Sequence, residues 1–157
     1  MHPKIEAKLQ DSSCKYIVHY HAQQAVPIQN PQDFANALGY DLSRIAKTLF
    51  LKGDGPDRYG LAVCSINKKV DFALLASEMQ CKRVQVAKRE ALQASLGYPP
   101  NGVSPLGVEE FPIFLDQAVM GLETVLVGAG EVGVEIEIAP ADLVLLTRAV
   151  VLKFSNE

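Results

Sequence analysis

The sequence predicts an α+β domain in which a mixed, largely antiparallel sheet of about seven strands is flanked by helices. Segments with helical and strand periodicity alternate along all 157 residues, and no polar linker is long enough to separate two cores. Two pairs of neighbouring strand segments are joined by short glycine-rich turns, which favours hairpins. With 48% apolar and 21% charged residues, the chain has the composition and size of one globular unit, so we expect a single domain over residues 1–157.

Five segments combine helical spacing of apolar residues with helix-start or helix-end signals. Asn30 before Pro31 is an N-cap followed by a proline in the first turn, and Gly39 and Gly97 each follow the last apolar residue of a segment. The predicted helices cover residues 3–10, 31–38, 71–79, 88–96 and 140–146.

Strands are predicted where β-branched and aromatic residues form short apolar or alternating runs. These runs are residues 16–20, 45–51, 59–65, 83–86, 113–115, 124–127, 134–138 and 150–154. Gly53 to Asp57 is a turn sequence between two of them. Gly128 to Gly133 resembles a GxGxxG motif, but a strand follows it where a dinucleotide site needs a helix, so it also predicts a hairpin turn. In Val134 to Ile138, apolar and acidic residues alternate, which predicts a strand with one wet face.

Composition excludes several classes of protein. No stretch approaches the roughly 18 unbroken apolar residues of a membrane helix, and the first residues lack the apolar run of a secretion signal, so we expect a soluble, cytosolic protein without membrane contacts. Cys14, Cys64 and Cys81 have no CxxC spacing, and we expect them to be reduced and packed. The net charge of -3 argues against a protein that coats DNA or RNA, so any RNA must be held by a local basic site.

Lys47 is the first candidate for function. Strand periodicity places it in an apolar row with Ile45, Leu49 and Leu51. Its side chain either extends to water from the edge of a sheet or provides a cation in a cleft that binds a phosphate or an oxyanion.

The second candidate is the loop from Asn101 to Gly107. Its prolines and glycines exclude regular structure, and it is either a long connection or a rigid loop that presents backbone N–H groups to a ligand. His19 and His21 point the same way on a strand, but no third ligand clusters with them, so partly buried or solvent-facing histidines are expected and no metal site. No GxSxG, HExxH or phosphate-binding loop is present.

These features together resemble the YbaK and prolyl-tRNA synthetase insertion-domain family of aminoacyl-tRNA deacylases. The resemblance covers nearly the whole chain and is carried by four groups of residues in the same order and at matching intervals. They are Ile45-Ala46-Lys47-Thr48-Leu49, Gly102 to Gly107, Phe114-Leu115-Asp116, and Val127 to Gly130 leading to Ile136-Glu137-Ile138 and Asp142-Leu143.

The resemblance implies a YbaK-like fold and hydrolysis of the ester between a mischarged amino acid and the terminal ribose of tRNA, assisted by the tRNA 2′-hydroxyl or the substrate side chain. It places the functional lysine at Lys47 and the GxxxP loop at residues 101–105, where Asn101 replaces the first glycine. The implied catalytic residues are Lys47 and Gly102. Lys47 would hold the terminal phosphate or ribose, and the N–H groups of the loop around Gly102 would bind the aminoacyl carbonyl. The implied substrate-binding residues are Asn101, Val103, Ser104, Pro105, Gly107, Asp116, Gly128 and Gly130.

By the same resemblance, we expect trans-editing of tRNA, most often tRNA for proline carrying Cys, Ala or another small residue. The partners are then the acceptor end of the aminoacyl-tRNA and a synthetase such as prolyl-tRNA synthetase, with no metal and no cofactor. Two alternatives remain: a non-catalytic module that binds a tRNA end or a protein, and an esterase for small metabolites. An esterase for small metabolites needs no basic surface that faces RNA. In this sequence the candidates for such a surface are Lys68, Lys69, Lys82, Arg83, Lys88 and Arg89.

Overall fold

The computed structural model describes residues 1–157 and contains five α-helices, three short 3-10 helices and ten strands. The α-helices are α1 (Pro3–Gln10), α2 (Pro31–Leu38), α3 (Phe72–Glu78), α4 (Arg89–Leu96) and α5 (Pro140–Thr147). The 3-10 helices are η1 (His21–Gln23), η2 (Leu42–Arg44) and η3 (Gln117–Gly121). The strands are β1 (Tyr16–Tyr20), β2 (Ala46–Gly53), β3 (Tyr59–Ser65), β4 (Lys69–Val70), β5 (Val84–Val86), β6 (Ile113–Asp116), β7 (Val125–Gly128), β8 (Val134–Ile138), β9 (Val150–Leu152) and β10 (Ser155–Asn156).

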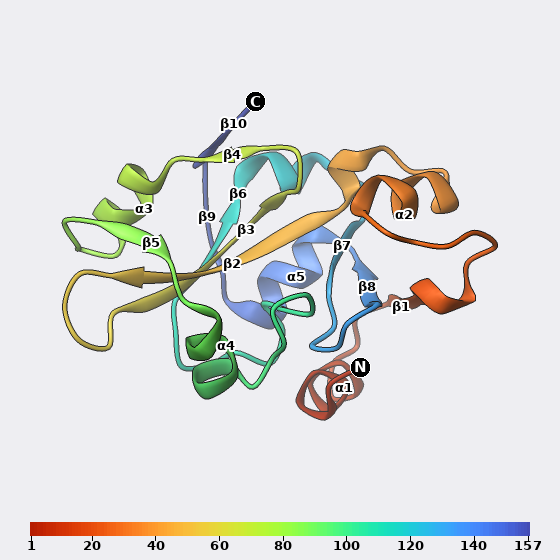
Figure 1. Ribbon diagram of the computed structural model, residues 1–157, viewed down its shortest axis with the longest axis horizontal. Helices are drawn as coiled ribbons and strands as arrows, with labels where there is room; N and C mark the ends of the chain where they lie inside the picture. Colours follow the sequence, from red (N-terminus) through yellow and green to blue (C-terminus); the bar gives the residue numbers. More distant parts are fainter.

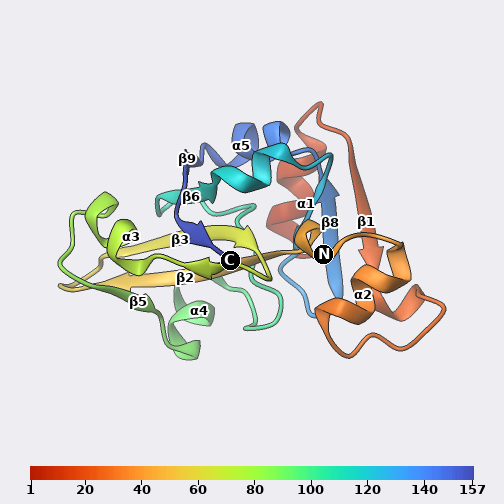
Figure 2. The same cartoon turned by 90° about the horizontal axis from the view of Figure 1, so that it is seen from above.

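Two main sheets meet at the beginning of β2. The larger has the order β5-β2-β3-β6-β9, in which β2 is antiparallel to its neighbours and β6 is parallel to β3 and β9. The smaller, β1-β8-β7, is antiparallel and runs steeply across the larger one in Figure 2. A single bridge between Ile45 and Leu126 connects them. The start of β2 lies next to α2 (Figure 1). The short pair β10-β4 forms the third sheet.

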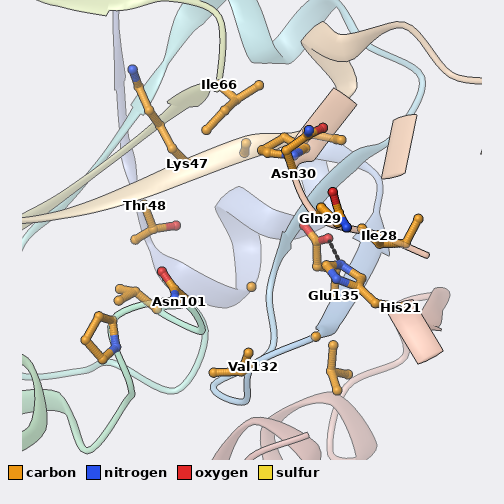
Figure 3. Close-up of a pocket in the computed structure, with 18 residues that line it drawn as sticks. His21, Ile28, Gln29, Asn30, Lys47, Thr48, Ile66, Asn101, Val132 and Glu135 are labelled. Carbon is orange, nitrogen blue, oxygen red and sulfur yellow. Dashed lines mark hydrogen bonds and ion pairs between the residues drawn. The ribbon is translucent and has the colours of Figure 1, made fainter. Parts of the chain in front are cut away.

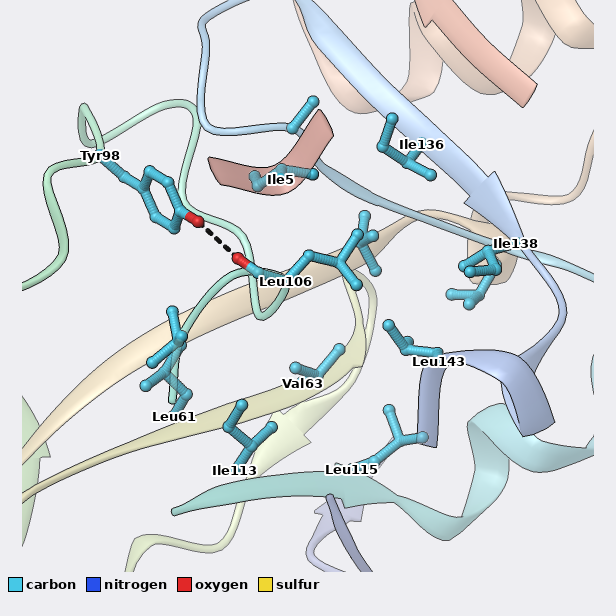
Figure 4. Close-up of a cluster of buried hydrophobic side chains, with 14 of the residues drawn as sticks. Ile5, Leu61, Val63, Tyr98, Leu106, Ile113, Leu115, Ile136, Ile138 and Leu143 are labelled. Carbon is cyan, nitrogen blue, oxygen red and sulfur yellow. Dashed lines mark hydrogen bonds between the residues drawn. The ribbon is translucent and has the colours of Figure 1, made fainter. Parts of the chain in front are cut away.

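The main hydrophobic core fills the angle between these sheets. It contains 20 buried side chains from both sheets and from α1, α4 and α5. Leu106, in the loop after α4, lies among side chains of β3, β6, β8 and α5 (Figure 4). The Tyr98 hydroxyl, itself buried, donates to the Leu106 carbonyl, so the proline-rich loop is anchored inside the core.

Two smaller clusters hold the outer helices. Leu75 of α3 packs on the opposite face of the larger sheet with Leu51 and Cys64. On α2, Phe34 packs against Ile45 and Leu126, at the bridge between the sheets. All three cysteines are free thiols. None of the helices has the length and hydrophobicity needed to cross a lipid bilayer.

The predicted fold class and the largely antiparallel pairing are confirmed, and all five predicted helices lie within two residues of the observed ones. The caps act as expected: the Asn30 side chain accepts from the Asp33 N–H at 2.8 Å, and Gly39 has a φ of 70°. Both predicted hairpins are present. The strand predicted over 150–154 is wrong at its end, because Phe154 leaves β9 to donate its N–H to Asp116.

Candidate functional site

A cleft of about 480 Å³ opens where the two sheets meet. Its volume lies within the range of about 300–1,000 Å³ that is common for small-ligand sites. The walls come from the beginning of β2, the segment before α2, the loop after α4 and the β7–β8 hairpin (Figure 3). The lining residues are His21, Ile28, Gln29, Asn30, Pro31, Ile45, Ala46, Lys47, Thr48, Ile66, Pro100, Asn101, Val103, Gly128, Val132, Gly133, Val134 and Glu135.

One wall is made by direct contact between two stretches of backbone. A Cβ on Gly128 would lie 2.2 Å from the Val103 carbonyl oxygen, and a Cβ on Gly102 would lie 2.8 Å from the backbone N of Glu131. Both distances are too short for any side chain, so the hairpin and the loop can meet only because these positions are glycine. The tight contact holds Val103 and Gly128 at the edge of the cleft.

The opposite wall is β2, whose successive side chains point to opposite faces. Thr48 extends towards Asn101 across the cleft (Figure 3). Its hydroxyl oxygen is buried and has no hydrogen-bond partner in the protein. Buried polar atoms are nearly always paired, so this unpaired hydroxyl, whose oxygen is closed off from solvent, marks Thr48 as an exception on this wall.

Lys47 leaves β2 on the other side from Thr48 and passes Ile66 (Figure 3). Its stem lines the cleft, while its ammonium donates to the Lys68 carbonyl at 2.6 Å. Lys47 is directly opposite Cys64 on β3. Burial raises the pKa of the Cys64 thiol to about 11 in spite of this nearby cation, which indicates an unreactive packed cysteine. The ammonium is therefore tethered to the backbone at Lys68, on the side of β2 away from Thr48, with two further N–H groups left to bind other acceptors.

The floor of the cleft carries a histidine–carboxylate pair, His21 and Glu135, with 2.7 Å between Nε2 and Oε2. A second pair, His19 and Glu137, lies beside it, with 2.7 Å between Nε2 and Oε1. The ring of Phe34 packs against both imidazoles, at centroid distances of 4.5 Å from His21 and 6.0 Å from His19. No three His, Cys, Asp or Glu side chains come together as a metal site, since each imidazole faces its own carboxylate.

The prediction that the acidic face of β8 is wet is wrong. Glu137 is 5% exposed and accepts hydrogen bonds from Thr124, at 2.6 Å, and Tyr40, at 3.0 Å. Burial opposes ionisation of Glu137, but the hydrogen bonds from Thr124, His19 and Tyr40 outweigh it and lower its pKa. For Glu135, burial dominates and raises the pKa, against the hydrogen bond and charge of His21. Alternation marked these acids correctly, but the imidazoles of His19 and His21 and the ring of Phe34 on α2 pack over the face that the acids occupy.

Among the residues that the sequence predicted for the site, Lys47, Asn101, Val103 and Gly128 line the cleft. Gly102 does not, and its N–H is already donated to the Pro99 carbonyl at 3.0 Å. The N–H groups of Asn101 and Val103 have no partner within the chain. The donors that this loop can offer a ligand are therefore those on either side of Gly102.

The other predicted residues lie away from the cleft and are used by the fold. Ser104 is fully buried, and its hydroxyl accepts from the Leu106 N–H at 3.1 Å. Asp116 is 1% exposed and binds Phe154 N, Ser155 N and the Ser155 hydroxyl. Of the remaining three, Pro105 is buried. Gly107 and Gly130 have a positive φ, and both pack against Tyr98.

Sequence reasoning did not assign a site role to Thr48, Glu135 or the segment from Ile28 to Pro31. Thr48 is adjacent to Lys47 and could have been found by asking which residue of β2 faces the opposite way. Glu135 could have been found only by pairing β1 with β8, which places it beside His21.

Comparison with known proteins identifies relatives of this chain. The family described as the aminoacyl-tRNA editing domain matches residues 25–146. A protein of Enterococcus faecalis named as a candidate Cys-tRNA(Pro)/Cys-tRNA(Cys) deacylase, EbsC, is 34% identical over 120 residues, which cover 74% of this chain and 71% of EbsC. A proline–tRNA ligase of Shouchella clausii is 30% identical over 99 residues, 63% of this chain but only 17% of the ligase. Among solved structures, the hypothetical protein APE2540 superimposes over 98% of this chain and 99% of its own, with a TM-score of 0.84 at 23% identity.

Thr48→Val tests whether the Thr48 hydroxyl contributes to the fold. Valine keeps the shape and removes a buried hydroxyl without a partner, so we expect the free energy of unfolding to stay the same or to rise by up to about 1 kcal/mol. Thr124→Val is the matched control: its hydroxyl binds Glu137, and its loss should cost about 1–3 kcal/mol. Urea unfolding measures both. Equal destabilisation by the two variants would show that Thr48 has a structural partner.

Proposed function

This chain belongs to the aminoacyl-tRNA editing domain family, and we propose that it hydrolyses the ester between a small, mischarged amino acid and the terminal ribose of tRNA. The proposed substrate is tRNA for proline carrying Cys, Ala or another small residue. Support for this choice comes from the named relatives and from the small cleft with its backbone wall. The observation that carries the proposal is the position of Thr48 and Lys47 opposite the loop from Asn101 to Val103.

Hydrolysis adds one water molecule across the ester and releases the free amino acid and the tRNA with its ribose hydroxyl restored. The attack creates negative charge on the carbonyl oxygen, which preorganised N–H donors stabilise. We assign this role to the free N–H groups of Asn101 and Val103, because the N–H of Gly102 is bound to Pro99. The unpaired Thr48 hydroxyl lies beside the same space, and we assign it to orient the ester once a small shift of its surroundings exposes it.

Charge in the cleft distinguishes the two ends of the substrate. Among the lining residues, Glu135 is the one acid and Lys47 the one lysine, and no arginine is present. The α-ammonium of the amino acid is therefore assigned to Glu135 on the floor, and the terminal phosphate or ribose to Lys47 at the mouth. The ammonium of Lys47 reaches this position by rotation of its flexible stem away from the Lys68 carbonyl. No step requires a metal ion.

Size is the basis for the preference for small residues. A synthetase pocket discriminates against a missing methylene by only about 1–3 kcal/mol, so a second site that admits the smaller residue corrects the error. Here the glycine contact between Gly128 and Val103 fixes one wall, and Asn101 adds a side chain where the resemblance predicts glycine. The proposed editing takes place in trans. It acts on the mischarged tRNA either after its release from a synthetase such as prolyl-tRNA synthetase or in complex with that synthetase.

A deacylation panel tests this function. The protein is incubated with Cys-, Ala- and Pro-tRNA for proline, and with an aminoacyl ester of adenosine, each with and without a chelator. We expect rapid loss of Cys or Ala, an intact Pro-tRNA, and equal rates with chelator. Binding without hydrolysis would instead support the non-catalytic module, and hydrolysis of the adenosine ester alone would support a metabolite esterase. Loss of activity on chelation, with recovery on addition of zinc, would contradict the metal-free mechanism.

Lys47→Ala should lower the single-turnover deacylation rate on the order of 10²-fold, the scale expected for losing one electrostatic contact to the transition state. Stability should fall by about 1 kcal/mol, because the partly buried hydrogen bond from Lys47 to the Lys68 carbonyl is lost. Lys47→Arg should rescue poorly, because a planar guanidinium places its donors differently from an ammonium. Lys15→Ala, which removes an exposed lysine outside the cleft, is the control. A folded Lys47→Ala protein with a normal rate would remove Lys47 from the site.

A further inference from the structure

A group of unpaired cations lies along the edge strand β5, outside the cleft. It consists of Lys52 on β2, Lys82 and Arg83 before β5, and Lys88 and Arg89 after it, and we call it the basic edge. All five side chains are exposed, and none makes an ion pair or a side-chain hydrogen bond. In a chain of 15 basic and 18 acidic residues, one third of the cations is thus gathered on one edge and takes part in no ion pair.

The far end of the basic edge is a built depression of about 510 Å³ between the β2–β3 hairpin, α3 and β5. Asp54 is its one acidic lining residue, and its carboxylate accepts the backbone N–H groups of Lys82, at 2.7 Å, and Arg83, at 3.1 Å. The hydrogen bond from the Arg83 backbone is the main cause that lowers the pKa of Asp54. The carboxylate therefore holds the backbone in place and leaves the side chains of Lys82 and Arg83 free.

Strand register directs the basic edge towards the cleft. β5 pairs antiparallel with β2, so that Val84 lies beside Gly53, and the Ala87 N–H donates to the Phe50 carbonyl at 2.8 Å. Lys88 and Arg89 follow directly and lie at the end of β5 that is nearer to the cleft. Thr48 and Lys52 are separated by about 13 Å along β2, at about 3.3 Å per residue.

An aromatic ring is part of the same depression. Phe72, the first residue of α3, is 37% exposed and lines it with Lys52 and Arg83. A groove of cations with an accessible ring is the arrangement that binds single-stranded nucleic acid, because the cations contact phosphates and the ring stacks on a base.

We propose that the basic edge binds the phosphates of the acceptor arm that precede the terminal nucleotide in the cleft. The inference rests on the proposed function and adds a second contact site to it. The earlier set of basic candidates is divided by the fold: Lys68 pairs with Glu157, and Lys68 and Lys69 lie beside β10 in a different sheet. The proposed RNA contacts are few and lie on one edge, which agrees with a net charge of -3.

Two double variants, Lys82→Ala with Arg83→Ala and Lys88→Ala with Arg89→Ala, test the basic edge. Binding of uncharged tRNA is measured by fluorescence anisotropy across a salt series, and hydrolysis is measured on aminoacyl-tRNA and on the aminoacyl ester of adenosine. Lys15→Ala with Lys153→Ala removes the same charge elsewhere and serves as the control. For each edge variant we expect about tenfold weaker tRNA binding, a salt slope lower by about two, and an unchanged rate on the adenosine ester.

The outcomes separate this inference from the proposed function. Edge variants that bind tRNA as tightly as the control, with the same salt slope, would overturn the basic edge even if editing is confirmed. If the edge variants bind tRNA normally but lose association with a synthetase, the partner is an acidic protein surface, and the RNA assignment is wrong. Absence of hydrolysis by the unmodified protein would refute the proposed function, while the binding series would still test the edge.

Discussion

The cleft depends on the contact between the backbone at Gly102 and Val103 and the backbone at Gly128 and Glu131. Both glycines lie where a Cβ would come within 3 Å of the other segment, so a side chain at either position would force the wall open. The loop is held from behind by Tyr98, whose buried hydroxyl binds the Leu106 carbonyl. A wall made of backbone and anchored in the core is rigid, and the proposed site, which admits small residues and excludes larger ones, requires such rigidity.

Strand alternation then determines the chemistry of the opposite wall. Thr48 and Lys47 are neighbours on β2, yet one side chain faces the loop and the other passes Ile66. An unpaired hydroxyl beside the cleft and an ammonium tethered to the Lys68 carbonyl are thus placed on two sides of the same strand. The acids of β8 contribute one accessible carboxylate, Glu135, because Glu137 is enclosed by Thr124 and Tyr40.

Much of the fold could be predicted because its signals are local. Asn30 and Gly39 define α2 by capping, and the turn residues define both hairpins without reference to the rest of the chain. The predicted strand over 150–154 extends beyond the observed end at Leu152. The reason is that Asp116, far away in sequence, binds the backbone that follows Leu152. No local pattern contains that information.

The site was predictable in part for the same reason. Lys47 and the loop around Val103 carry recognisable patterns, and both line the cleft. The resemblance could not tell which loop residues face a ligand, since Ser104 is turned into the core by its bond to Leu106. Glu135 and the basic edge depend on the pairing of β1 with β8 and of β5 with β2.

The central claim is that the aminoacyl group binds between the loop and β2, and backbone amide NMR with a non-hydrolysable, amide-linked aminoacyl-adenosine tests it most directly. We predict that the largest chemical-shift changes occur at Asn101, Val103 and Thr48, with Glu135 also affected. The N–H of Gly102 should keep its hydrogen bond to the Pro99 carbonyl and therefore stay protected from hydrogen exchange. Shift changes confined to other surfaces, with these residues unaffected at saturation, would contradict the assignment of the cleft.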